Sequence, residues 1–265
     1  MLKKYKAIFF DWDGTAVMSR RAPVDQAVAA MRPLLQKGIK LIIVSGTTIE
    51  NIAGGKIESY FAEEELKNLY LGLGRGAYNY SFKDGIPYIF KNMVPDKGEI
   101  LKIHQICFEI HQTLKEKYDF DTDIVFSRPN YCKIDLMVEN QMEDGLSGLI
   151  HLAKQTGKKY GIDVAPTCDA KYLEVGVTSK SDNVNVILEK ICTENNIKPE
   201  ECTYWGDEYV GIEKDIFGSD SFMKTEKSQN GDFYDVSEVT GERPSGVQKI
   251  GGGVDRFLCF LHEQE

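Results

Sequence analysis

A strand-helix-strand pattern near the start of the chain constrains its fold more than any other feature. Ala7–Phe10 and Leu41–Val44 are short apolar runs without a polar interruption, which is typical of strands buried on both faces. Between them, the apolar residues of Val24–Leu35 recur at helical spacing. A βαβ unit of this kind predicts a Rossmann-like α/β core with a parallel sheet covered by helices. In such sheets, ligands bind at the carboxyl ends of the strands.

The pattern changes in the middle of the chain. Asp84-Gly85 lies between two β-prone segments and is a strong hairpin signal. A long amphipathic helix and several β-like segments follow, and the core pattern returns after Tyr172–Val175. We therefore expect a discontinuous α/β core, formed by 1–83 and 176–265, with an inserted α+β cap domain over 84–175.

The charge balance restricts the class of partner. The 265 residues include 41 acidic and 32 basic side chains, which gives a formal net charge of −9. A chain with this balance has no general basic field to attract nucleic acid, so we expect no nucleic-acid partner. A small anionic metabolite remains a suitable partner, provided that a metal ion or a few focused basic side chains create a local positive site.

The cysteines and the apolar runs bear on location. No two of the six cysteines form a CxxC pair, which argues against a zinc ribbon or a redox motif. The first apolar run ends at Asp11 and is too short for the core of a signal peptide, and no later run reaches the roughly 18 apolar residues of a membrane span. We therefore expect a cytoplasmic protein that does not enter a membrane.

The segment Asp11-Trp12-Asp13-Gly14-Thr15 follows the first apolar run directly. It puts two carboxylates where a parallel sheet opens to solvent. One carboxylate can attack phosphorus and form an aspartyl-phosphate, while a second can protonate the leaving oxygen and later activate water. Asp and Gly are also common turn formers, so this segment by itself fits a plain acidic turn equally well.

Three further signals follow in a fixed order: Ser45-Gly46-Thr47 after the second core strand, Lys180 before a helix, and Gly206-Asp207-Glu208 after a later strand. Together with the first segment, this order resembles the haloacid dehalogenase superfamily, whose motifs are DxDxT, a strand-end Ser or Thr, a Lys and an acidic GD motif. The resemblance covers the core. It implies a Mg²⁺-dependent phosphatase with the following residues in its site: Asp11 as nucleophile, Asp13 as general acid and base, Ser45, Gly46 and Lys180 around the phosphate, and Asp11, Asp207 and the backbone carbonyl of Asp13 on the metal.

The acidic motif departs from the family pattern after Asp207. The family's second acid would fall at Gly211 or Ile212, and neither side chain can bind a metal. Four nearby acids are candidates for that role, and the sequence leaves the choice open, although Asp215 has the spacing of phosphomannomutase-like members. The candidates are Glu208, Glu213, Asp215 and Asp220.

The insertion resembles the α+β cap of the Cof-type and sucrose-phosphatase-like branch, whose members mostly act on phosphorylated sugars. Arg75 lies in Gly74-Arg75-Gly76-Ala77, where that branch commonly has Asn-Gly-Ala, and is a candidate substrate residue. In the cap, a cluster around a Pro turn provides further candidates for reading a substrate: Arg128, Asn130, Tyr131 and Lys133. A solvated surface loop is the competing interpretation of that cluster.

Our hypothesis is a phosphatase that hydrolyses a small phosphomonoester, for which the resemblance implies a phosphorylated sugar. Within the superfamily that the chain resembles, branches that need no acid at this step often replace the second Asp, so Asp13 favours phosphatase or phosphomutase chemistry, and no motif separates the two. A sugar-phosphate sensor without catalysis is a further alternative, but the complete set of motif residues argues against it. The sequence predicts no oligomeric state.

Overall fold

The computed structural model describes residues 3–126, 128, 130–137, 144–168 and 171–265. The chain divides into two compact units, which we call unit 1 and unit 2. Unit 1 contains Met1–Met93, Lys180–Val210 and Ser219–Glu265, and unit 2 contains Val94–Ser179 and Gly211–Gly218. These limits differ from the sequence-based ranges at 83/84 and 175/176, and they move the short segment 211–218 out of the core. The role of unit 2 as a cap stays a prediction.

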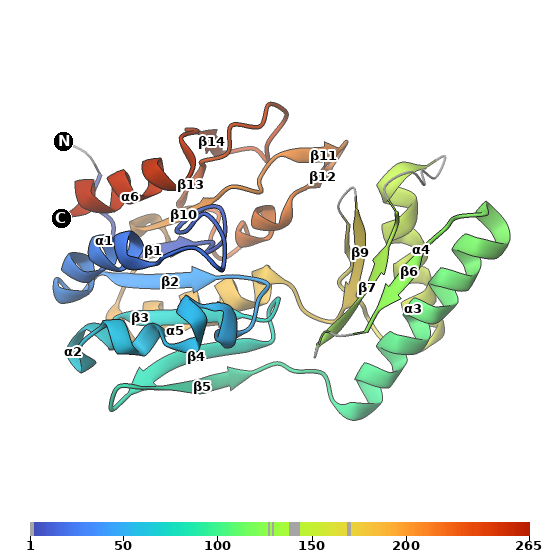
Figure 1. Cartoon of the computed structure of the whole chain (residues 1–265), viewed down its shortest axis with the longest axis horizontal. Helices are drawn as coiled ribbons and strands as arrows, with labels where there is room; N and C mark the ends of the chain where they lie inside the picture. The colour runs from blue at the N-terminus through green and yellow to red at the C-terminus, as the bar shows by residue number, and fades with distance from the viewer. Residues whose placement is uncertain (1–2, 127, 129, 138–143, 169–170) are drawn as a thin grey trace. The chain divides into compact units, whose positions relative to one another are not determined.

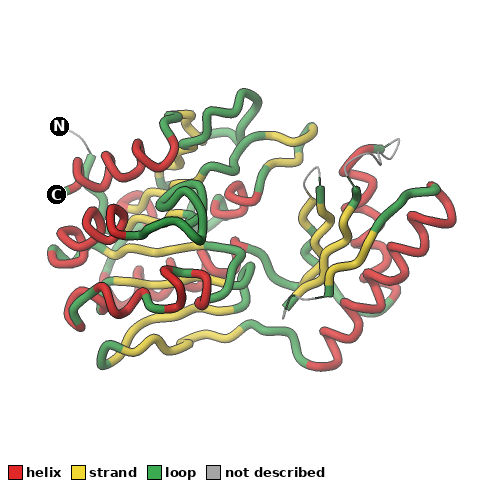
Figure 2. Tube along the Cα trace, in the orientation of Figure 1, coloured by secondary structure: helices red, strands yellow, loops and turns green. Residues whose placement is uncertain are grey.

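Unit 1 is built on one eight-stranded sheet with the strand order β14-β13-β10-β1-β2-β3-β4-β5 (Figures 1 and 2). The first six of these strands are parallel to one another, and β4 pairs antiparallel with both β3 and β5. This confirms the Rossmann-like α/β core. The strands are β1 (Ala7–Phe10), β2 (Lys40–Val44), β3 (Leu69–Leu73), β4 (Tyr78–Lys83), β5 (Ile86–Asn92), β10 (Cys202–Gly206), β13 (Asp232–Asp235) and β14 (Val247–Lys249).

Helices cover both faces of this sheet. Since side chains alternate along a strand, β1 directs Ile8 and Phe10 to one apolar core and Ala7 and Phe9 to another. Helices α1 (Asp25–Gln36) and α6 (Gly253–Gln264) complete the first core, and α5 (Lys180–Asn195) completes the second. The continuous apolar runs of the sequence are thus explained by burial on both faces.

Short helices complete unit 1 at the sheet's margins. They are η1 (Ile49–Asn51), η2 (Ala53–Gly55), η3 (Ile57–Tyr60), α2 (Glu63–Leu66), η4 (Pro199–Glu201) and η5 (Ser219–Met223). Of these, η5 matters most for the site, because it follows β10 and contains the buried Asp220.

The predicted hairpin at Asp84-Gly85 joins β4 to β5. Both turn residues have positive φ, 52° and 75°, as a tight two-residue hairpin requires. Strand β5 pairs with β4 and therefore belongs to the sheet of unit 1. The break in the βαβ pattern at this hairpin thus marks the antiparallel edge of the core sheet.

Unit 2 has a four-stranded sheet of its own, in the order β6-β7-β9-β8, with adjacent strands antiparallel. Helices α3 (Lys97–Tyr118) and α4 (Gly145–Lys159) share a separate apolar core with this sheet. A capping box starts α3, in which Asp96 and Glu99 each accept a hydrogen bond from the other's backbone N–H. The strands are β6 (Asp123–Val125), β7 (Tyr131–Asp135), β8 (Thr167–Cys168) and β9 (Tyr172–Gly176).

A hairpin of β11 (Gly211–Glu213) and β12 (Ile216–Phe217) also belongs to unit 2. Glu213 accepts a 2.7 Å hydrogen bond from the backbone N–H of Leu146 and a 3.2 Å bond from the hydroxyl of Ser147. The Glu213 carboxylate therefore satisfies N–H donors in the first turn of α4, and its negative charge interacts favourably with the positive end of the helix dipole. These contacts give Glu213 a structural role within unit 2.

Among the helices that the structure describes, none has the length and apolar composition needed to cross a membrane.

Candidate active site

Asp11 is the first residue after β1, at the carboxyl edge of the sheet in unit 1. Its backbone N–H donates to the carbonyl oxygen of Trp205 at 3.0 Å, which extends the pairing of β1 with β10. The side chain is buried, and its Oδ1 lies 3.3 Å from Nζ of Lys180 without forming a hydrogen bond among the described residues. Because buried polar atoms usually have a hydrogen-bond partner, this carboxylate oxygen is available to bind a further group.

Asp207 follows β10, which is the neighbour of β1, and is half-buried. Its Oδ1 accepts a 3.1 Å hydrogen bond from the hydroxyl of Thr15. A Cβ atom on Gly14 would lie 2.1 Å from Oδ2 of Asp207, and Gly14 has a φ of +81°. The Gly-Thr pair of the first motif therefore lets the loop after β1 approach and orient a carboxylate on the adjacent strand.

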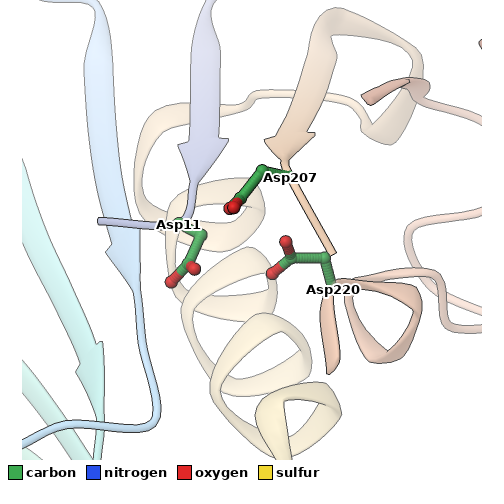
Figure 3. Close-up of side chains that lie close together, drawn as sticks. All are labelled: Asp11, Asp207 and Asp220. Atoms are coloured by element: carbon green, nitrogen blue, oxygen red, sulfur yellow. The ribbon is translucent and has the colours of Figure 1, made fainter. Parts of the chain in front are cut away.

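Asp220 in η5 is the third carboxylate of the cluster and is fully buried. Its Oδ1 accepts from Nζ of Lys180 at 2.7 Å, and its Oδ2 accepts from the backbone N–H of Glu208 at 2.8 Å. Oxygen atoms of Asp11, Asp207 and Asp220 lie within 4.8 Å of one another, and Figure 3 shows the three carboxylates directed into one space.

The other three candidates for the second acid are not part of this carboxylate cluster. Glu208 is exposed and accepts from the hydroxyl of Ser219 at 2.6 Å. Glu213 binds the first turn of α4, and Asp215 is exposed in the turn between β11 and β12, with a φ of 62°. Of the four acids that the sequence left open, Asp220 is the one that joins Asp11 and Asp207.

The electrostatics of this cluster are dominated by burial. Burial raises the pKa of Asp11 well above its usual value, and the nearby carboxylates add to the rise, while Lys180 opposes it. Burial and the carboxylates of Asp220 and Glu208 raise the pKa of Asp207 to about 7. For Lys180, burial disfavours the ammonium, but the attraction of Asp11 and Asp220 outweighs it and raises the pKa.

These residues fit a divalent cation. When ionised, three carboxylates and one ammonium give the cluster a net charge of −2, and buried charge of this size needs compensation. Carboxylate oxygens are the ligands that Mg²⁺ prefers. The Oδ1 atom of Asp11 lacks a hydrogen-bond partner among the described residues, so it can bind such a cation without breaking a hydrogen bond of the described chain.

Asp13 lies in the loop that follows β1, and its side chain is partly exposed. Its Oδ2 lies 3.2 Å from Nη2 of Arg20, while its Oδ1 is buried without a hydrogen-bond partner in the described part of the chain. Arg20 was not among the predicted residues, because this ion pair depends on how the loop after β1 folds back. The metal contact predicted for the Asp13 carbonyl stays a prediction.

Ser45 and Gly46 directly follow β2, the other neighbour of β1. Ser45 is buried, and its backbone N–H donates to the carbonyl oxygen of Gly72 at 2.9 Å. Its hydroxyl accepts a long hydrogen bond, 3.4 Å, from the backbone N–H of Thr47. Phe10 pairs with Ile43, so Ser45 follows β2 at the same edge of the sheet at which Asp11 follows β1.

The predicted substrate residues lie in both units. Arg75 is buried in the turn between β3 and β4 of unit 1. In unit 2, Arg128 is exposed, and Nζ of Lys133 lies 2.5 Å from Oε1 of Glu174 and 4.7 Å from the ring centre of Tyr172. The charge of Lys133 is therefore balanced within unit 2. Contacts of these residues with a substrate stay predictions.

No protein-family model matches the chain, and no curated protein matches its sequence. Solved structures do match its fold. A structure of Plasmodium falciparum IMP-nucleotidase matches with a TM-score of 0.56 at 15% identity, over 77% of this chain and 54% of that one. Its N-terminally truncated, IMP-bound form matches with a TM-score of 0.63 at 13% identity, over 98% and 68%.

Trehalose-6-phosphate phosphatase of Aspergillus fumigatus matches with a TM-score of 0.60 at 13% identity, over 97% of this chain and 91% of that one. The chain spans about half of the first IMP-nucleotidase structure and nearly all of this phosphatase. At such identities the likeness concerns the fold. The chain therefore has the fold of these phosphatases, and it has a cluster of three carboxylates and a lysine at the carboxyl edge of its sheet.

Proposed function

We propose that this protein is a Mg²⁺-dependent phosphohydrolase in which Asp11 takes a phosphoryl group from a small phosphomonoester. The observation that carries the proposal is the meeting of Asp11, Asp207 and Asp220 around Lys180, at the edge where ligands bind to parallel sheets. The fold shared with phosphatases and the resemblance to the haloacid dehalogenase superfamily support the same chemistry.

Asp11, Asp207 and Asp220 would hold the Mg²⁺. When bound, the ion supplies positive charge that neutralises the carboxylates and the oxygens of the transferred phosphoryl group. Lys180 adds a positive charge beside Asp11 and favours its ionised form. Thr15 fixes one oxygen of Asp207, and the N–H of Glu208 fixes one oxygen of Asp220, so both carboxylates are held in place before substrate arrives.

In the proposed reaction, a carboxylate oxygen of Asp11 forms a bond to phosphorus as the bond from phosphorus to the leaving oxygen breaks. Asp13 donates a proton to that oxygen, and the alcohol departs. Asp13 then accepts a proton from water, which attacks the aspartyl-phosphate and releases inorganic phosphate. The ion pair with Arg20 restrains the Asp13 carboxylate in the loop beside Asp11.

Around the phosphoryl group, Ser45, the backbone at Gly46 and Lys180 are the proposed phosphate ligands. Their hydroxyl, N–H and ammonium groups would stabilise negative charge as it develops on the phosphoryl oxygens. The substrate we propose is a small phosphorylated metabolite of sugar-phosphate type, with unit 2 acting as a cap that contributes to its selection. The match to a trehalose-6-phosphate phosphatase supports a phosphorylated sugar, and the match to an IMP-nucleotidase makes nucleotides the next class to examine.

The test is a screen for phosphate release from phosphorylated sugars, nucleotides and other metabolites, with and without Mg²⁺. We expect release from at least one ester, dependent on Mg²⁺ and without an added bisphosphate. Transfer between positions of a sugar that requires a bisphosphate activator would assign a phosphomutase instead. Tight binding of an ester without any turnover would contradict the proposed catalysis.

A further inference from the structure

The turn between β3 and β4 is held in an unusual conformation. Gly74, Arg75 and Gly76 follow one another with φ angles of 66°, 57° and 100°. Glycine adopts such angles readily, but an arginine in the left-handed region costs about 1 kcal/mol. Because Arg75 is also buried, this turn combines backbone strain with a buried cation at the carboxyl end of a core strand. Surrounding contacts must therefore stabilise it.

The side chain of Asn183 supplies contacts on one side of the turn. Asn183 is fully buried in α5, and its Oδ1 accepts a 2.7 Å hydrogen bond from the backbone N–H of Gly76. Its Nδ2 donates to the carbonyl oxygen of Tyr78 at 3.1 Å and to Oδ1 of Asn79 at 3.0 Å, with a longer contact of 3.5 Å to the carbonyl oxygen of Leu73. One amide thus binds the residues before, within and after the turn.

Two further features couple this arrangement to the phosphate side of the site. The N–H of Gly74 donates to the carbonyl oxygen of Thr47 at 2.8 Å, which attaches the turn to the loop that begins at Ser45. A Cβ atom on Gly72 would lie 2.7 Å from Cβ of Asn183, so the glycine in β3 provides the room for this close approach.

Helix α5 thereby contacts two parts of the carboxyl edge through residues one turn apart. Lys180 binds Asp220 and lies beside Asp11, and Asn183, three positions later, binds the turn. Strand β3 is two strands from β1, so the turn lies at the same edge of the sheet, about 10 Å from the nucleophile.

We propose that Asn183 is a positioning residue that holds the strained turn so that Arg75 is fixed beside the phosphate-binding loop and increases affinity for anionic substrate. This inference rests on the proposed function. Asn183 acts through the turn and touches no reacting atom. Replacing Asn183 should therefore weaken phosphate affinity and raise KM through Arg75, while the metal-binding carboxylates stay in place.

A double-mutant cycle tests the coupling, with inorganic phosphate as the probe. The chains are the wild type, Asn183→Ala, Arg75→Ala and the double variant, each checked for folding by circular dichroism and thermal unfolding. Asn183→Asp serves as a second variant, because it retains the volume and the acceptor for Gly76 but replaces the donor with a carboxylate oxygen. Asn185→Asp on the same helix is the matched control, since the side chain of Asn185 accepts from the hydroxyl of Thr225 at 2.7 Å.

We expect Asn183→Ala to weaken competitive inhibition by inorganic phosphate about tenfold in the wild-type background and less than about twofold in the Arg75→Ala background, with kcat changed less than KM. Asn185→Asp should match the wild type. Equal effects of Asn183→Ala in both backgrounds would overturn the inference, because they would show that Asn183 does not act through Arg75.

Crystal structures of the wild type and Asn183→Ala provide a readout that needs no activity. The inference requires that Arg75 leaves its left-handed conformation or loses its order in the variant, and an unchanged turn would overturn it. If the wild type releases no phosphate from any ester, the proposed function fails, and the crystal structures still decide whether Asn183 holds the turn.

Discussion

The charged groups of the two units differ in how they are balanced. In unit 2, Lys133 pairs with Glu174 at 2.5 Å, and Glu213 accepts hydrogen bonds from N–H donors of α4. In unit 1, three carboxylates gather around the single ammonium of Lys180. An excess of buried charge is costly unless a ligand compensates it, whereas a charge with a close partner needs no further compensation. We therefore propose that the carboxylate cluster of unit 1 carries the chemistry, whereas Glu213 in unit 2 has a structural role.

The largest expected effect is a loss of kcat on replacing Asp11, which replacement of an acid in unit 2 should not cause. Asp11→Asn should lower kcat by at least about 10⁴-fold, because the amide cannot act as nucleophile. The fold should survive, since the substitution removes repulsion among buried carboxylates. Phosphate release and thermal unfolding in metal-free buffer measure both effects. A folded Asp11→Asn protein with near wild-type turnover would disprove the assignment.

The next effect concerns Asp13. Asp13→Asn should lower the rate by about 10² to 10⁴-fold, the usual range for loss of a general acid and base. Mg²⁺ affinity should change little, because the Asp13 side chain lies outside the carboxylate cluster. Single-turnover kinetics and calorimetric titration with Mg²⁺ separate the two quantities. Lost Mg²⁺ binding with an unchanged single-turnover rate would reverse the roles that we propose.

Asp220 and Asp215 give a matched pair of acids close together in the sequence. Asp220→Asn should weaken Mg²⁺ binding by about 100-fold or more, since it removes a proposed ligand. Asp215→Asn should leave binding within about twofold, because Asp215 is exposed in a hairpin turn of unit 2 and Asn tolerates its positive φ. Calorimetric titration with Mg²⁺ is the measurement, and equal losses in both variants would refute the choice of Asp220.

These acids also show how far the sequence could go. Asp11 and Asp207 were predictable as strand-end acids, because each follows a predicted core strand and parallel strands bring such ends together. Asp220 could not be selected from the four candidates, because the chain between Asp207 and Asp220 forms a hairpin of unit 2 before it returns to unit 1. Spacing along the sequence favoured Asp215, whereas in the folded chain the more distant Asp220 lies close to Asp11 and Asp207.

Three other features lay beyond sequence patterns for related reasons. The hairpin at Asp84-Gly85 was predictable, but turn chemistry does not tell which sheet a strand joins, and β5 joined the core. The ion pair between Arg20 and Asp13 and the contacts of Asn183 depend on loop conformations. Helical spacing from Lys180 puts Asn183 on the same face of α5, and that was the one available signal.

A smaller effect is expected at Glu213. Glu213→Ala should lower the free energy of unfolding by about 1 kcal/mol, as is usual when a helix loses an N-terminal side-chain acceptor. Mg²⁺ affinity should stay within about twofold. Denaturant unfolding measures the first quantity and calorimetry the second. A large loss of Mg²⁺ affinity at unchanged stability would contradict the structural role that we assign to Glu213 in unit 2.

The smallest expected effect concerns substrate preference. Arg128→Ala and Lys133→Ala should change the ranking of good esters, while hydrolysis of p-nitrophenyl phosphate stays within a few-fold, or about 1 kcal/mol. Lys133→Ala also removes the ion pair with Glu174, so Glu174→Gln is the control for a purely local change. An unchanged ranking in both variants would remove these residues from substrate selection.

The most direct test of the account is to trap the phosphoryl group on the protein. Enzyme with substrate and Mg²⁺ is quenched in acid and treated with borohydride, which reduces an aspartyl-phosphate to homoserine, and peptide mapping locates the change. The Asp13→Asn variant, in which hydrolysis of the intermediate is slowed, should increase its yield. The account predicts homoserine at residue 11, dependent on both substrate and Mg²⁺. Steady phosphate release with residue 11 unmodified, or homoserine at another aspartate, would contradict it.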